Sequence, residues 1–242
     1  MYSIFKKEFL AYLSSLVAYL VIGIFLGVLG FLVWIYPESS VLEYGYADLA
    51  IMFDVIPWVY LFLIPALTMR TFSEEKKQGT IELLLTKPIK EWEIVLGKFL
   101  ACYALLTIAL LPTLVYYYSV LKLGNPQGNL DKGAFWGSYI GMFLLGGVFT
   151  SIGIFISTLT DNQLIAFIIT VFVCAFFHYG FAAFSRMIGK GSLSDILAQL
   201  GLDYHYYSLS KGLMDSRNLF YYFSLIFFML YSSVIQLISR NW

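Results

Sequence analysis

Apolar residues run along the chain in six long stretches with at most one charged residue each, separated by shorter polar segments. Each stretch has about the 20 residues that a helix needs to cross the hydrocarbon core of a bilayer. The pattern therefore predicts an all-α membrane protein with six transmembrane helices in a single domain, residues 1–242. The second stretch is the weakest, because it contains Asp54, Pro57 and Pro65. The six predicted spans are residues 16–36, 49–69, 99–121, 134–159, 163–185 and 219–239.

Composition supports this class. The chain is 60% hydrophobic and 12% charged, whereas soluble domains carry roughly 25% charged residues. Its net charge of zero gives no electrostatic attraction to nucleic acid, so no nucleic-acid partner is expected. Cys102 and Cys174 lie in apolar runs, and we expect both to be buried free thiols.

The distribution of Lys and Arg predicts the orientation. The first apolar stretch is too long for a signal peptide and lacks a small-x-small cleavage site, so we expect it to remain in the protein. A cytoplasmic N-terminus puts nine basic residues inside and six outside, which fits the positive-inside rule. Both termini and the loop of residues 70–98 are then cytoplasmic, and residues 186–218 form an outer loop. The inner set is Lys6, Lys7, Arg70, Lys76, Lys77, Lys87, Lys90, Lys98 and Arg240; the outer set is Lys122, Lys132, Arg186, Lys190, Lys211 and Arg217.

The N-terminal residues 2–13 alternate apolar and charged positions at helical spacing. Phe5 and Phe9 share one side with Ile4, while Lys6 and Lys7 lie between them. This pattern predicts an amphipathic interfacial helix. The alternative is a cytoplasmic extension of the first span.

Small residues recur four apart in two spans. Gly23 and Gly27 form a GxxxG pair in the first span, and Gly147 and Ser151 repeat the spacing in the fourth. Such pairs let helix backbones approach closely in lipid. We interpret both as packing within the chain rather than as a dimer seam.

Two polar connections have predicted structure. Between the fourth and fifth spans, "STLTDNQ" is short enough to require a helical hairpin, and Thr160 or Asp161 can cap the next helix. In the outer loop, Ser192 with Asp195 predicts a capping box. We expect the outer loop to pack back on the spans and to be partly re-entrant.

The residues of this chain predict no catalytic or metal site. There is no GxxxxGK[ST] sequence, so no P-loop for ATP, and no cofactor is expected in this chain. His178 and His205 have no Cys or carboxylate at metal-ligand spacing. His178 lies within a span; a satisfied packing role is favoured for it, and a functional role is the alternative. Charged residues are nearly absent from the spans, which argues against an ion-coupled carrier, although the role of Asp54 stays open.

The loop of residues 70–98 interrupts the apolar pattern with both signs of charge. After "MRTFSEEKKQ", Gly79 predicts a break and Thr80 the start of a helix that Pro88 ends. Ile81, Leu84 and Leu85 share one face of this short helix. Its size suits a groove on a soluble partner. The alternative is a helix lying on lipid.

The same segment resembles ABC-2 type permeases, in which a proline-bearing second span leads to a charged elbow, G-T-[IL]-E-L-L, a proline and a third span opening with G-K. The resemblance implies a type V exporter-like fold, a separate ATPase subunit that binds ATP–Mg, and a second permease subunit, with spans one, two and five at or near the dimer interface. It also implies that these residues form the coupling helix and its elbow: Glu74, Glu75, Lys76, Lys77, Gly79, Thr80, Ile81, Glu82, Leu83, Leu84, Leu85 and Pro88.

Several shorter strings, "ADL", "LGNPQGN" and "TSIGIF", resemble the permease subunit associated with gliding motility in bacteria. That resemblance implies the bacterial inner membrane and an auxiliary membrane subunit with a large outer domain. The expected function is ATP-driven export, or conformational work linked to gliding. A signalling or mechanical module that moves no solute is the main alternative, and an ion-coupled carrier is a third.

Overall fold

The computed structural model describes residues 1–43, 48–85, 89–189 and 191–239, and for residues 17 and 83–85 it describes the backbone alone. In these ranges all regular secondary structure is helical, so the predicted all-α class is confirmed. The helices are α1 (Tyr2–Ser14), α2 (Leu16–Trp34), α3 (Ala50–Thr68), α4 (Ser73–Lys77), α5 (Thr80–Leu85), α6 (Glu91–Leu110), α7 (Leu114–Leu123), α8 (Lys132–Leu159), α9 (Gln163–Ala175), α10 (Phe181–Ile188), α11 (Ser192–Gln199), α12 (Leu202–Ser210) and α13 (Ser216–Ile238).

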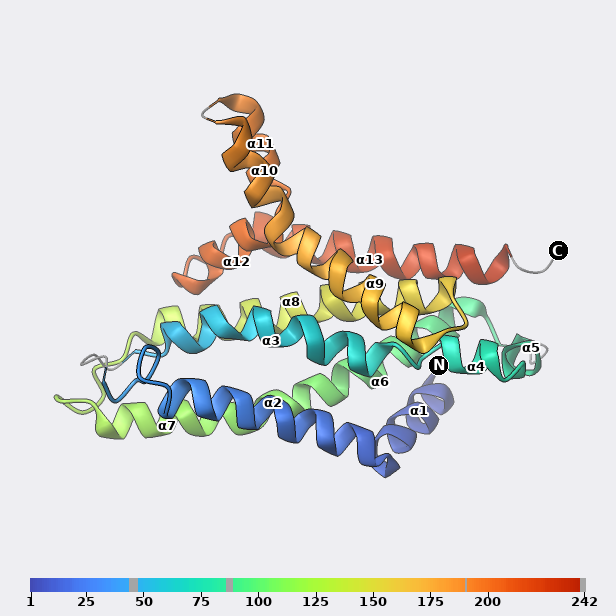
Figure 1. Ribbon diagram of the computed structural model, residues 1–242, viewed down its shortest axis with the longest axis horizontal. Helices are drawn as coiled ribbons and strands as arrows, with labels where there is room; N and C mark the ends of the chain where they lie inside the picture. Colours follow the sequence, from blue (N-terminus) through green and yellow to red (C-terminus); the bar gives the residue numbers. More distant parts are fainter. Residues whose placement is uncertain (44–47, 86–88, 190, 240–242) are drawn as a thin grey trace.

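The long helices lie along one axis, and α8 is the central element of the bundle (Figure 1). It packs against α3, α6, α9, α12 and α13. By length and composition, five segments of the described chain could cross a membrane, and the pair α1–α2, bent by 68°, would make a sixth. The five are Ala50–Lys77, Glu91–Leu123, Lys132–Leu159, Gln163–Ile188 and Ser216–Ile238.

Two of these segments change helical form along their length. The helix containing the third predicted span begins at Glu91, and a 3₁₀ turn at Leu111–Thr113, which includes Pro112, joins α6 to α7. In the segment Gln163–Ile188, a π-helical turn at Phe176–Gly180 separates α9 from α10. Pro57 and Pro65 both lie inside α3, which nevertheless continues without a break from Ala50 to Thr68.

The outer loop divides into two parts with different packing. Helix α12 packs on α8, and Tyr206 Oη donates a hydrogen bond of 2.7 Å to the carbonyl of Phe53. Helix α10 begins inside the predicted fifth span and ends in this loop; it forms a hairpin with α11 that projects from the side of the bundle (Figure 1). Only α12 therefore follows the prediction that this loop packs back on the spans.

Two predicted helix caps are wrong in detail. Helix α9 is capped by Asn162, whose Oδ1 accepts the N–H of Leu164 at 2.9 Å, while Thr160 Oγ1 accepts the N–H of Asn162 itself. Helix α11 begins after Gly191 with no side-chain cap, so Ser192 and Asp195 form no capping box. An amide one residue closer to the helix reaches the free N–H groups better than Thr160 or Asp161 does.

Glycines of α8 allow its neighbours to approach closely. A Cβ built on Gly147 would lie 2.9 Å from Ile226 Cδ1 of α13, and one on Gly153 would lie 2.8 Å from Thr68 Cβ of α3. Ser151 is fully buried and donates to Val148 O in its own helix. By contrast, no described atom lies within 4 Å of a Cβ built on Gly23 or Gly27, and both residues are exposed. The structure thus corrects the prediction that this pair packs within the chain.

Candidate functional site

The charged elbow lies at one end of the bundle, the end at which α1 and the C-terminal end of α13 also lie (Figure 1). After α3 the chain turns through residues 69–72 and forms the five-residue helix α4. Gly79 adopts a φ of 69°, in the left-handed region that glycine tolerates best, and α5 follows at once. The break predicted at this glycine is therefore confirmed.

One side of the elbow is exposed. Lys77, Gly79, Thr80 and Glu82 are all open to the surroundings, and Thr80 Oγ1 donates to Glu75 O at 3.3 Å. The main packing partner of α5 is α4. Ile81 is half-buried against a cluster that includes Phe72 and Ile94. The first turn of α5 is thus packed against the protein on one side and exposed on the other.

Part of the predicted coupling helix cannot be placed. The side chains of Leu83, Leu84 and Leu85 and the whole of Pro88 lie outside the described residues. The apolar face predicted for this helix is therefore tested at Ile81 alone.

The other side of the elbow is bonded to the bundle. Lys76 Nζ donates to the carbonyl of Thr158 at the end of α8. The hydroxyls of Thr71 and Ser157 lie 2.7 Å apart. Glu74 is half-buried and accepts a hydrogen bond of 3.3 Å from Gln78 Nε2. The elbow is therefore seated on the hairpin that joins α8 to α9.

A buried lysine lies beneath the elbow. Lys98 of α6 forms ion pairs with Glu8 of α1 at 3.1 Å and with Glu75 of α4 at 3.0 Å. Sequence reasoning placed Glu75 in the site, named Lys98 only as part of the G-K that opens the third span, and left out Glu8. A signal was present, since a charged residue inside an otherwise apolar helical run is commonly functional.

The N-terminal helix packs on the protein with one side and exposes the other. Ile4 is buried against α6, whereas Lys6 and Lys7 are exposed. Phe5 and Phe9 are half-buried, with stacked rings 5.6 Å apart. This face arrangement is compatible with an interfacial helix, and it also places α1 against the segment that follows the elbow.

The two histidines have different surroundings. Both ring nitrogens of His205 are bonded, Nδ1 to Asn218 Oδ1 at 2.7 Å and Nε2 to Gln199 O at 2.9 Å, which holds α12 to its neighbours. His178 is buried in the π-helical turn, and its Nδ1 has no hydrogen-bond partner among the described residues. The prediction that His178 is a fully satisfied packing histidine is therefore wrong. Among the described residues, no three His, Cys, Asp or Glu side chains gather at metal-binding distance.

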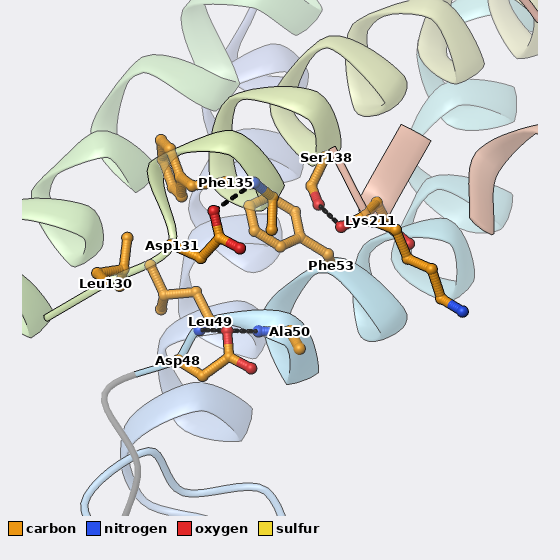
Figure 2. A pocket seen from close by; sticks show the side chains of 11 residues that line it. Asp48, Leu49, Ala50, Phe53, Leu130, Asp131, Phe135, Ser138 and Lys211 are labelled. Carbon is orange, nitrogen blue, oxygen red and sulfur yellow. Dashed lines mark hydrogen bonds between the residues drawn. The ribbon is translucent and has the colours of Figure 1, made fainter. Parts of the chain in front are cut away.

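A cavity of about 290 Å³ opens at the end of the bundle opposite the elbow (Figure 2). Asp48 and Asp131 border it, but each already accepts backbone N–H groups at a helix start, at 2.7 and 2.8 Å. Ser138 donates to Ser210 O, and the side chain of Lys211 points away from the cavity in Figure 2. The two carboxylates therefore stabilise the starts of α3 and α8, and the Ser138 hydroxyl links α8 to the end of α12.

The free cysteines Cys102 and Cys174 are both buried, as predicted. Outside the spans, burial raises the pKa of the Asp203 carboxyl in α12 above its usual range, and the Arg186 charge acts in the opposite direction. Neither feature forms part of the elbow.

Comparison with known proteins adds the family. Residues 2–238 match the family described as ABC-2 family transporter protein. Comparison with curated proteins gives no match. The matched range includes α1, the elbow and every candidate membrane span, so the family applies to the whole bundle. A helical bundle with five or six candidate spans, a charged elbow at one end and this match together show that the chain belongs to the ABC-2 transporter family, as a multi-pass membrane permease subunit.

Proposed function

We propose that this chain is the membrane-spanning subunit of an ATP-driven transporter and that a separate ATPase subunit docks on α4 and α5. The observation that carries the proposal is the elbow itself. It presents Lys77, Thr80 and Glu82 outward, while Lys76 and Glu75 bind it to the bundle. A charged outer rim around a short helix suits a protein groove, and the buried bonds provide a route for force into the spans.

The finer parts of the proposal rest on the family and on the distribution of basic residues. ATP–Mg is bound by the ATPase and not by this chain. The elbow faces the cytoplasm, with both termini on that side of the bacterial inner membrane. Two permease subunits form the functional unit, and the exposed Gly23–Gly27 face of α2 is available for that contact. An auxiliary subunit and a link to gliding motility rest on the short sequence strings alone.

The test is a charge reversal at the elbow. The complex is isolated from native membranes through a tag on this chain, and ATP turnover is measured in nanodiscs. We expect Glu82→Lys to reduce the ATP turnover that is isolated together with the tagged chain by about tenfold, because the substitution reverses a charge at the exposed rim. The matched control is Glu43→Lys, an exposed glutamate at the other end of the bundle.

One outcome of this experiment would contradict docking of the ATPase on the elbow. Equal turnover and equal ATPase recovery in wild type, Glu82→Lys and Glu43→Lys would show that the elbow does not receive the ATPase. Recovery of an unidentified protein without ATP turnover would not support the proposal.

One observation favours a second candidate function, mechanical work without a transported solute. Two buried hydroxyls in the middle of α8 bond to their own helix, Thr150 to Gly146 O at 2.7 Å and Ser151 to Val148 O at 2.7 Å. Polar groups satisfied in this way do not line a path for a polar solute. Reconstituted complex separates the two: ATP-dependent movement of a lipid or polymer supports transport, whereas turnover without movement supports mechanical work.

A further inference from the structure

The ammonium group of Lys98 joins three segments that are distant in the sequence. It lies 3.1 Å from Glu8 Oε1, 3.0 Å from Glu75 Oε1 and 2.6 Å from Thr71 O. A lysine ammonium has three N–H donors, so each of them has an acceptor here. The acceptors come from α1, from α4 and from the turn between α3 and α4.

The group is almost completely withdrawn from solvent. The side chain of Lys98 is 1% exposed, and those of Glu8 and Glu75 are 15% and 16% exposed. The ring of Phe72, also buried, lies 4.9 Å from Lys98 Nζ and adds a cation–π contact. A charge buried this deeply is retained only where its partners are held in place, so the four groups form a fixed cluster.

The residue before Lys98 brings α1 close enough for this cluster to form. A Cβ built on Gly97 would lie 3.0 Å from Ile4 Cβ and 3.3 Å from Met1 O. A side chain at position 97 would therefore require α1 to shift slightly away from α6, and glycine allows the closer packing. Further along α1, Tyr12 Oη donates to Leu67 O at 3.1 Å, so the helix is attached at both α6 and α3.

We propose that Lys98 is a positioning residue that makes α1, the elbow and the start of α6 move as one body when an ATPase displaces α4 and α5. This inference rests on the proposed function, because it assigns the route by which movement of the elbow reaches the spans. The pairing with Glu75 takes up the displacement of α4, and the pairing with Glu8 passes it to α1.

The variants are chosen to separate positioning from folding. Lys98→Met alone leaves two buried carboxylates without their cation, and it is expected to reduce the amount of folded protein. The triple variant Lys98→Met, Glu8→Gln, Glu75→Gln removes all three charges and keeps the side-chain sizes similar. Lys132→Met, at an exposed position at the other end of the bundle, is the matched control.

The first readout is the distance between α1 and the elbow. Spin labels are placed at Leu10→Cys and Gln78→Cys, both exposed positions, while the native thiols are buried. Labelled chain is diluted with unlabelled chain in the isolated complex, and distances are measured without nucleotide and with a non-hydrolysable ATP analogue. In wild type and in Lys132→Met we expect one narrow distribution that nucleotide does not change. In the triple variant we expect nucleotide to shift or broaden it.

The second readout is permease-dependent ATP turnover, which we expect to fall by about tenfold in the triple variant, the scale of an ordinary allosteric coupling. A nucleotide-independent distance in the triple variant, or a nucleotide-dependent distance in wild type, would overturn the inference. If the triple variant keeps wild-type turnover while Glu82→Lys loses it, the proposed function stands and the role of Lys98 is wrong. If Glu82→Lys also keeps it, both are wrong.

Discussion

At the scale of single residues, the same residue type has opposite roles in two helices. Gly153 of α8 faces Thr68 of α3 at a distance that leaves no room for a side chain, whereas Gly23 of α2 faces no described atom within 4 Å. Spacing along the sequence cannot distinguish these cases, because it reports only that small residues share a face. The difference lies in which helix happens to cross that face.

This difference predicts a contrast in stability. Gly153→Ala should lower the free energy of unfolding by about 1–3 kcal/mol, because the new methyl group forces α3 away from α8. Gly23→Ala should leave the stability of the isolated chain unchanged or slightly improved, since its face is open. Tryptophan fluorescence during thermal unfolding in detergent measures both. Equal midpoints for the two variants would contradict the packing described for Gly153.

At the scale of elements, the elbow contains a helix break that depends on local sequence, whereas its position depends on contacts with other helices. Gly79 ends the α4 segment through its own backbone conformation. The orientation of α4 depends instead on Thr158 of α8 and on Lys98 of α6. The elbow could therefore be predicted as a charged helical turn, but its attachment could not.

The side of the membrane on which the elbow lies can be tested directly. A membrane-impermeant maleimide should not label Gln78→Cys in intact spheroplasts and should label it after permeabilisation. Glu43→Cys, exposed at the opposite end, should be labelled in both conditions. The native thiols are buried and contribute little background. Labelling of Gln78→Cys in intact spheroplasts would place the elbow outside and exclude docking of a cytoplasmic ATPase.

At the scale of the whole molecule, the number of crossings depends on one bent pair. Five helical segments of the described chain are long and apolar enough to span a bilayer, and α1 with α2 adds a sixth only if the two together cross. If six segments cross, the N-terminal and C-terminal ends of the chain lie on the same side of the membrane. If five cross, they lie on opposite sides.

Reporter fusions decide between these topologies. With six crossings, an N-terminal epitope and a C-terminal green fluorescent protein should both report the cytoplasm, and a C-terminal alkaline phosphatase should be inactive. An active phosphatase combined with a cytoplasmic N-terminal epitope would show that only five segments cross. It would leave the family assignment unaffected.

The all-α class, the long apolar helical segments and the charged elbow can be read from the amino-acid sequence. These depend on the residues within each segment, because transfer of a helix into lipid and the conformation of Gly79 are local properties. Only the tertiary structure decided that Lys98 meets Glu8, ninety positions earlier in the chain, that Gly153 packs while Gly23 does not, and that α12 folds back while α10 and α11 project. Those outcomes depend on contacts between segments that are far apart in the sequence, and no local pattern specifies which helices become neighbours.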